Sequence, residues 1–313
     1  MKERLLWLSV FIIIVSSIGN YLYFKDKQID KPIFLEHYIV KELFEENEMI
    51  EFTIYYLTNK QDPHKIHNVF IDGVDANIYN QSSTGWHFGT EQVEYIDQFN
   101  HHYLMSVNLA IWTDALNLKE DEVVSIKDVT FFLSNGDQVT ANIGEILITG
   151  PPLPNEKEVI YSPFQMSSSD HFTENFFVAT EPLFIESLSI PFFDQIGKQI
   201  NIQYSIDQEV TKKLYDRHNL ADRFFTIDAW KEFNVQPLKS TDFPISLAKD
   251  EKLWLLTELK YDRPQFTSFN LTWSGTTLEG DLFSFRTSVG DFPVVDQEYV
   301  IQLIKEYKEG ATR

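Results

Sequence analysis

The sequence predicts an all-β (mainly β) protein: two tandem antiparallel β-sandwich (Ig-like) domains behind a single N-terminal transmembrane helix, with few short helices, one of them at the C-terminus. Three observations lead to this prediction. Several segments alternate apolar and polar residues with period 2, the pattern of half-buried strands. A proline-rich stretch divides the chain into two parts of sandwich size. An apolar run near the N-terminus matches the thickness of a bilayer.

The apolar run LLWLSVFIIIVSSIGNYLYF extends from Leu5 to Phe24. About twenty helical residues reach about 30 Å, the thickness of a hydrocarbon core, so the run predicts a retained anchor whose partner is the lipid bilayer. The alternative is a secretory signal that is cleaved at the small residues Ser17-Ile18-Gly19, which releases the protein.

The basic residues that flank this run bear on its orientation. Lys2 and Arg4 precede it, whereas Lys25, Lys27 and Lys31 follow it, and this count alone favours a cytoplasmic C-terminal side. However, the free N-terminal amine adds positive charge to the short side, and a basic-then-apolar start is the form of an export signal. We therefore expect a single-pass protein of the cell membrane with the bulk of the chain outside the cytoplasm.

The strand prediction depends on three alternating segments, which are Met49–Leu57, Tyr103–Ile111 and Ile200–Ile206. In the first, Ile50, Phe52, Ile54 and Tyr56 share one face. Such strands, separated by turn residues, are typical of antiparallel sandwiches and not of parallel α/β sheets.

The domain division depends on TGPPLPNEKE, which contains three prolines in a short polar run. Proline is excluded from sheet interiors and favours an extended connection. The predicted organisation is an anchor segment over residues 1–28, a first sandwich over 29–150, a linker over 151–158, and a second sandwich with a C-terminal helix over 159–313.

Two hairpins and two helices refine this prediction. Pairing Trp273 with Leu278 leaves the two-residue turn Gly275-Thr276, with glycine first as a type II′ turn requires. Pairing Leu133 with Val139 leaves a three-residue loop. The two hairpins fit either a tandem duplication or the general similarity of sandwich hairpins.

The predicted helices run from Val295 to Lys308, with Asp296 as the N-cap and Gly310 ending the helix, and from Asp207 to about His218.

Composition narrows the function classes. The chain has 26 Lys+Arg and 47 Asp+Glu, for a net charge of -21, and such a surface excludes nucleic acid as a partner. It has no cysteine, which excludes disulfides and thiolate metal sites and favours a bacterial envelope protein over a secreted eukaryotic one. No motif for a cofactor is present, and we expect none.

The segment TGWHFGT supplies the main candidate binding residues, Trp86, His87 and Phe88. The flanking glycines allow this loop to project its aromatic side chains, so that Trp86 offers a stacking platform for a sugar or a partner protein. The alternative is that Trp86 or Phe88 plugs the space between the sheets, as large aromatic residues usually do.

Three further patterns are candidates for metal binding or catalysis. Asp72, Asp75 and Asn77 in IDGVDAN offer clustered oxygen ligands for calcium, and a solvated turn is the alternative. His64-x-x-His67 with His101-His102 suggests a zinc or copper site only if loops bring these residues together; solvated loop histidines are the alternative.

Ser246-x-x-Lys249 has the spacing of a lysine-activated serine, but it lacks the companion motifs of penicillin-recognising enzymes. We therefore expect no catalytic residue there.

These observations together predict a membrane-anchored extracytoplasmic protein, a binding or assembly module of a bacterial cell envelope whose partner is another envelope protein or a glycan. The alternative is an envelope enzyme such as a glycan hydrolase that uses a carboxylate pair. Two inward carboxylates in a concave face would favour the enzyme, and a packed sandwich with an aromatic rim would favour binding.

Overall fold

The computed structural model describes residues 2–43, 49–79, 94–112, 116, 118–119, 122–150, 159–168, 171–219, 235–260, 264–292 and 295–311. The strands of the first half are β1 (Ile33–Phe34), β2 (His37–Glu42), β3 (Met49–Asn59), β4 (Ile66–Phe70), β5 (Ala76–Ile78), β6 (Asp97–Gln98), β7 (His102–Trp112), β8 (Val123–Leu133) and β9 (Gln138–Thr149). Those of the second half are β10 (Ile160–Ser168), β11 (Phe172–Ala179), β12 (Leu183–Ser189), β13 (Ile200–Ser205), β14 (Gln236–Pro237), β15 (Ile245–Leu247), β16 (Lys252–Leu259), β17 (Phe266–Thr277) and β18 (Leu282–Asp291). The helices are α1 (Lys2–Lys27), α2 (Phe193–Ile196), α3 (Gln208–Asn219) and α5 (Gln297–Ala311), with short 3-10 turns η2 (Gly197–Gln199) and η3 (Ser240–Asp242).

The strands form three sheets. The N-sheet has the order β1-β3-β7-β5, with β6 also paired to β7, and the C-sheet has the order β10-β11-β16-β13-β14. The third, which we call the shared sheet, has the order β15-β12-β17-β2-β9-β8-β4, with β18 paired to β17, and so contains strands from both halves. The mainly β prediction is confirmed. Within the described residues every pairing between named strands is antiparallel except the two that β2 makes, with β9 and with β17.

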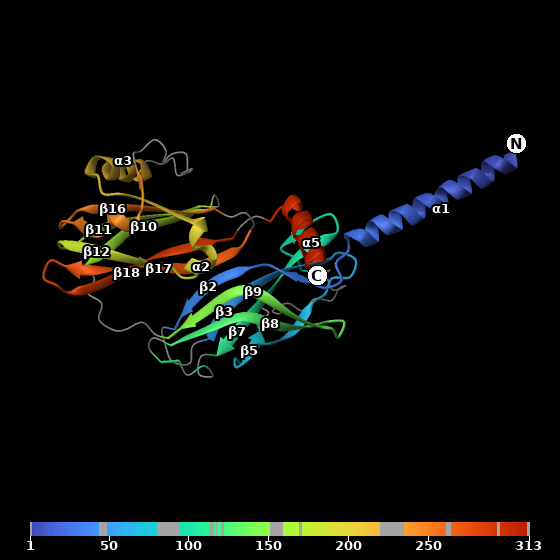
Figure 1. Cartoon of the computed structure of the whole chain (residues 1–313), viewed down its shortest axis with the longest axis horizontal. Coiled ribbons are helices and arrows are strands. Elements are labelled where there is room, and N and C mark those ends of the chain that lie inside the picture. Colours follow the sequence, from blue (N-terminus) through green and yellow to red (C-terminus); the bar gives the residue numbers. More distant parts are fainter. Residues whose placement is uncertain are drawn as a thin grey trace.

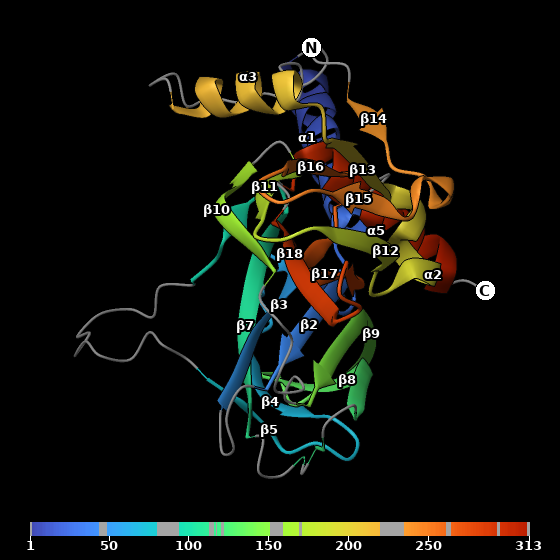
Figure 2. The same ribbon diagram turned by 90° about the vertical axis from the view of Figure 1, so that its left-hand side faces the viewer.

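The N-sheet and the C-sheet pack on the shared sheet through two separate hydrophobic cores. In the first core Phe52 and Leu109 of the N-sheet meet residues such as Phe131 of β8. In the second core Leu255 of the C-sheet meets residues such as Trp273 of β17. Each half of the molecule is therefore a two-sheet sandwich, and the halves lie side by side (Figures 1 and 2).

Strand β2 contributes to both cores. Ile39 is buried in the first core, whereas Tyr38 and Val40 face the second. Because neighbouring residues of a strand point to opposite faces, the N-sheet and the C-sheet cover opposite faces of the shared sheet. The neighbouring strand β9 follows the same rule, with Ile146 in the first core and Leu147 against the second.

Helix α3 adds a layer to the second half. Its Leu214 packs with Phe176 and Trp254 on the outer face of the C-sheet, and Figure 2 shows α3 lying beyond β10, β11 and β16. Strand β11 is consequently buried at every position. The predicted helix from Asp207 is confirmed: the Asp207 carboxylate accepts hydrogen bonds from the backbone N–H of Glu209 and of Val210 (2.8 and 3.0 Å).

The C-terminal helix is also confirmed, with the predicted cap. The backbone N–H of Tyr299 donates to the Asp296 carboxylate at 2.8 Å. The helix continues through Gly310 to Ala311, so the expectation that glycine ends it is wrong. Although α5 follows the second half in sequence, Val300 lies in one buried cluster with residues of the first half such as Leu57. The linker 151–158 lies outside the described residues, and the division into domains 29–150 and 159–313 stays a prediction.

The predicted hairpin registers are wrong, for one shared reason. Thr276 pairs with Leu282, and the backbone N–H of Thr277 donates to the carbonyl of Asp281 at 2.9 Å. In the other hairpin the N–H of Leu133 donates to the carbonyl of Asp137 at 2.9 Å. Both three-residue loops therefore end in a glycine with positive φ, Gly280 (93°) and Gly136 (89°). The last residue of such a loop has a left-handed backbone, which glycine adopts without steric cost. The strand pairing of each hairpin is therefore shifted so that the glycine occupies this last position.

Helix α1 projects away from the β body, and α5 lies beside its base (Figure 1). The segment Leu6–Lys27 is long and apolar enough to cross a membrane, and none of its apolar window is buried. Where the helix meets the body, Asn59 makes two hydrogen bonds with the backbone of Ile29, at 3.0 and 2.7 Å. The chain therefore passes from the helix directly into packed structure.

We predict that Gly144→Ala destabilises the protein strongly. Gly144 has a φ of 91°, and a Cβ there would lie 2.4 Å from the carbonyl oxygen of His37 on the adjacent strand β2. Backbone strain and this contact together cost about 3 kcal/mol of unfolding free energy. Urea unfolding of the full chain in detergent micelles, followed by tryptophan fluorescence, measures the loss.

Gly290→Ala is the matched control for this substitution. Gly290 is also in a strand of the shared sheet, but a Cβ there meets nothing within 4 Å. Its effect should stay within about 0.5 kcal/mol. Equal stability of the two variants would contradict the close approach of β9 to β2.

Candidate functional site

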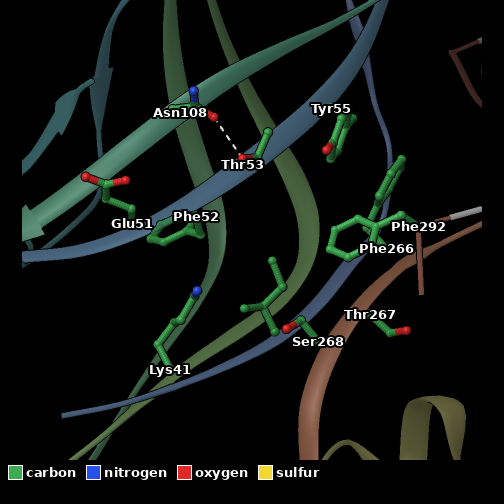
Figure 3. Close-up of a pocket in the computed structure, with 11 residues that line it drawn as sticks. Lys41, Glu51, Phe52, Thr53, Tyr55, Asn108, Phe266, Thr267, Ser268 and Phe292 are labelled. Carbon is green, nitrogen blue, oxygen red and sulfur yellow. Dashed lines mark hydrogen bonds between the residues drawn. The ribbon is translucent and has the colours of Figure 1, made fainter. Parts of the chain in front are cut away.

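A groove lies where the N-sheet, β2 and β17 meet, and we call it the junction groove (Figure 3). It has a volume of about 380 Å³, which is within the range of ligand-binding sites. β3 contributes Glu51, Phe52, Thr53 and Tyr55, β2 contributes Ile39 and Lys41, β17 contributes Phe266, Thr267 and Ser268, and Asn108 and Phe292 complete the lining.

A second hollow continues the junction groove along β3. It has a volume of about 410 Å³ and shares Lys41 and Glu51 with the first. Glu42, Met49 and Asn270 are among the residues that it adds. Because both hollows are lined by consecutive parts of β3, the combined site is elongated and follows that strand.

One end of the junction groove is aromatic. The rings of Tyr55 and Phe266 stack with centroids 3.9 Å apart and an angle of 12° between their planes. Phe292 is 6.4 Å from Phe266 and is 67% exposed. An exposed aromatic residue beside a stacked pair offers apolar contact area to a ligand.

His37 lies behind this aromatic end and is fully buried. Its ring stacks on Phe266 at 5.3 Å and on Tyr55 at 5.9 Å. The backbone N–H of Tyr55 donates to Nε2 of His37 at 3.0 Å, and Nδ1 lies 3.3 Å from the carbonyl oxygen of Ile143. These partners select the neutral tautomer with the proton on Nδ1. Burial lowers the pKa of His37 to about 4, so the ring stays neutral at physiological pH.

Polar groups lie along the rest of the groove. The Thr53 hydroxyl donates to the side-chain oxygen of Asn108 at 2.8 Å, and Figure 3 shows Lys41 extending from β2 towards β3. In the second hollow Glu42 forms an ion pair with Arg286 and accepts a hydrogen bond from Asn270 at 3.4 Å. The Arg286 and Asn270 contacts join β2 of the first half to β17 and β18 of the second.

The predicted binding loop Trp86-His87-Phe88 lies outside the described residues, and its role stays a prediction.

The predicted calcium ligands Asp72, Asp75 and Asn77 are all exposed. They flank a turn in which Gly73 has a φ of 71° and the N–H of Val74 donates to the carbonyl of Ile71 at 3.1 Å. Among the described residues no group of three or more His, Asp or Glu side chains is placed to hold a metal ion. Calcium binding by these two carboxylates and one amide therefore stays a prediction.

The four candidate histidines His64, His67, His101 and His102 are not among any group of three or more metal-binding side chains in the described part of the chain. Two of these four are buried, which corrects the expectation of solvated loop histidines. His64 is 9% exposed and His102 is 3% exposed. Burial, together with the neighbouring His101 and Lys308, lowers the pKa of His102 to about 4. Ser246 lies exposed in β15, where it pairs with Phe184 of β12, and not at the start of a helix.

Sequence reasoning missed the groove because its residues are distant in the chain. His37 and Tyr55 precede Phe266 by more than two hundred positions. The run HYIV in β2 could have indicated a central strand that is covered on both faces, since such a strand has consecutive apolar residues and no alternation.

No family model matches the chain, and no curated protein matches it. Among solved structures, the D00-D0 domain of intimin has a TM-score of 0.23 and 8% identity, with 84% of this chain and 100% of that chain covered. The CupB2 chaperone of Pseudomonas aeruginosa has a TM-score of 0.17 and 7% identity over 81% and 98% of the two chains. The collagen binding domain of the Erysipelothrix rhusiopathiae surface protein RspB has a TM-score of 0.20 and 10% identity over 84% and 93%. Similarities of this size carry no functional argument.

The fold and the groove define a class of protein: a β-sandwich protein with an apolar N-terminal helix and an elongated groove between its two sandwiches.

We predict that stability falls as the pH drops from about 6.5 to about 4, in part through His37. The unfolded chain binds a proton at this histidine with a pKa of 6.5, whereas the folded chain does so only at about 4. Because the unfolded state binds more protons in this window, its contribution is complete above pH 6.5 and about 3 kcal/mol is lost on acidification. Urea unfolding at a series of pH values measures this loss.

His37→Gln isolates this contribution, because glutamine keeps a donor and an acceptor but does not titrate. The variant should lose the His37 share of the pH dependence and keep the share of His102. An unchanged pH profile in the variant would show that His37 is not buried as a neutral ring.

Proposed function

We propose that the protein is a single-pass membrane-anchored, extracytoplasmic binding or assembly module of a bacterial cell envelope, with Leu5–Phe24 in the bilayer. The observation that carries this proposal is the exposed apolar helix α1, which extends from a packed β body that has an open groove. An unburied apolar helix of this length needs a nonpolar environment, and a bilayer supplies one.

The base of α1 supports retention of the anchor over cleavage of a signal. Tyr23 and Phe24 pack edge-on against His101, with ring centroids 6.4 and 5.9 Å away. The Lys308 ammonium of α5 donates to the carbonyl oxygen of Asp26. The residues that follow the apolar run are therefore part of the folded body, and cleavage after Gly19 would leave a helical stub attached to it.

The location outside the cytoplasm rests on the basic-then-apolar N-terminus, and the absence of cysteine fits a bacterial envelope. We assign ligand binding to the junction groove, and on the sequence argument alone we keep Trp86, His87 and Phe88 as a second contact region and Asp72, Asp75 and Asn77 as calcium ligands. We also propose that residues 29–150 and 159–313 are two domains.

The groove favours binding over the enzyme alternative. A glycan hydrolase needs two carboxyl groups that face one bond, one of them as a general acid. Glu51 and Glu42 line the elongated site, but Glu42 is paired with Arg286 and bonded to Asn270. A stacked aromatic end with engaged polar side chains is the composition of a binding surface.

We predict that Leu5–Phe24 stays in the membrane and that the β body is outside the cytoplasm. The test adds protease to spheroplasts of cells that express the full chain, and sequences the N-terminus of the mature protein. A full-length, membrane-bound chain whose β body is digested from outside is the expected result. Protection of the body from external protease would reverse the topology, and a new N-terminus at Asn20 would mean that the protein is released.

A further inference from the structure

We propose that the junction groove binds an extended polypeptide segment, which adds as a strand to the open edge of β3. This inference deepens the proposed function by naming the ligand class of its groove, and it rests on that function.

The open edge is defined by the pairing of β3. On one side β3 pairs with β7 along its whole length, from Met49 to Asn59. On the other side β1 pairs only with Tyr56 and Leu57, because the chain then crosses to the shared sheet as β2. From Tyr55 back to Met49, the edge of β3 that is opposite β7 faces the groove. Figure 3 shows β3 between β7 and the groove.

Tyr55 marks where the edge ceases to be occupied. Its backbone N–H donates to His37 Nε2 and its carbonyl accepts from the N–H of Leu35, both at 3.0 Å. Both groups of a residue in an antiparallel strand point to the same side, and this orientation repeats every two residues. Thr53, Glu51 and Met49 therefore direct their N–H and C=O groups to the same edge, and among the described residues no backbone group pairs with them there.

The shape of the site matches this edge. The two hollows share Lys41 and Glu51 and together follow β3 from Met49 to Tyr55. A stretch of this length accommodates a strand of about six residues, or about 20 Å. A compact ligand would occupy one hollow, whereas an extended main chain runs through both and satisfies the free backbone groups.

The lining specifies side chains of the added strand. At the Tyr55 end, the stacked ring of Phe266 and the exposed ring of Phe292 offer contact to an apolar side chain. Backbone pairing gives affinity in such a complex, and pockets for alternate side chains give specificity. We therefore expect a segment with an apolar residue at the Tyr55 end.

The test uses the full chain in lipid nanodiscs and a phage-displayed library of random twelve-residue peptides, from which binders are selected and synthesised. Thr53→Pro removes the edge N–H without touching the ladder to β7, since proline is tolerated where its nitrogen faces outward. We expect it to weaken binding about tenfold, the equivalent of one hydrogen bond. Thr53→Val is the matched control: it loses the same hydroxyl bond to Asn108 but keeps the backbone N–H, so the difference in affinity between the Pro and Val variants reports the edge N–H alone.

Amide hydrogen exchange supplies a second readout in the unmodified protein. The N–H groups of Glu51 and Thr53 should exchange fast in the free protein and become protected by the peptide, whereas that of Ile54 is protected throughout. If Thr53→Pro fails to fold, the test uses peptides that each carry one N-methylated backbone amide. Methylation should abolish binding at every second residue, because only those N–H groups face β3. An even or absent effect of methylation would overturn the proposal.

Other results would also overturn strand addition. These are the selection of no peptide, equal binding by the Pro and Val variants, and protection of Glu51 and Thr53 in the free protein. A dimer of the free chain that Thr53→Pro dissociates would assign the edge to a second copy. The protease mapping is independent of this test. A reversed topology would rule out the envelope function and leave the binding mode intact. If the peptide failed to protect the N–H groups of Glu51 and Thr53 from exchange, strand addition would be ruled out and the membrane topology would be unaffected.

Discussion

The structure depends on the strand β2, which is paired in parallel with β9 of the first half and β17 of the second. Because its adjacent residues Tyr38 and Ile39 are buried in different cores, β2 cannot be displaced without loss of packing in both sandwiches. The close approach of Gly144 and the buried ring of His37 fix its position. Two sandwiches that share a sheet in this way are joined by backbone pairing as well as by side-chain contact.

The groove is a consequence of the same crossing of the chain. After β1 the chain leaves the N-sheet and enters the shared sheet as β2. One edge of β3 is therefore left without a neighbouring strand on the Met49 side of Tyr56. The Nε2 atom of His37 accepts the hydrogen bond from the backbone N–H of Tyr55. In a longer strand β1, a backbone carbonyl would accept this bond. A buried neutral histidine is well suited to this position, since it accepts one hydrogen bond and donates another while its ring lies parallel to the rings of both Tyr55 and Phe266.

The C-terminal end of α1 and the helix α5 meet at the first sandwich. Helix α5 packs through Val300 against Leu35 and Leu57, and Lys308 bonds to the backbone at the end of α1. Asn100 of the first half also donates its backbone N–H to Gln297, at 2.9 Å. The C-terminal end of α1, the helix α5 and the N-sheet thus form one packed unit, and the second sandwich is joined to it by the pairing of β2 with β17.

The sequence by itself determined the features that depend on local patterns. The alternation in Met49–Leu57 predicts a strand whose even-numbered residues are buried, and Ile50, Phe52, Ile54 and Tyr56 are buried. The caps Asp207 and Asp296 and the apolar run at the N-terminus are equally local signals, because each depends on residues within a few positions.

The tertiary structure alone decided the pairing of β2 with β17, the register of the two hairpins and the position of the groove. The parallel pairing joins His37 to Phe266, and no short-range pattern records a contact across that separation. Leu133 was given the wrong partner because the left-handed backbone at Gly136 sets the loop more strongly than side-chain alternation does. The groove exists because the chain changes sheets between β1 and β2, and this crossing depends on contacts of His37, Tyr38 and Ile39 with residues that are distant in the sequence.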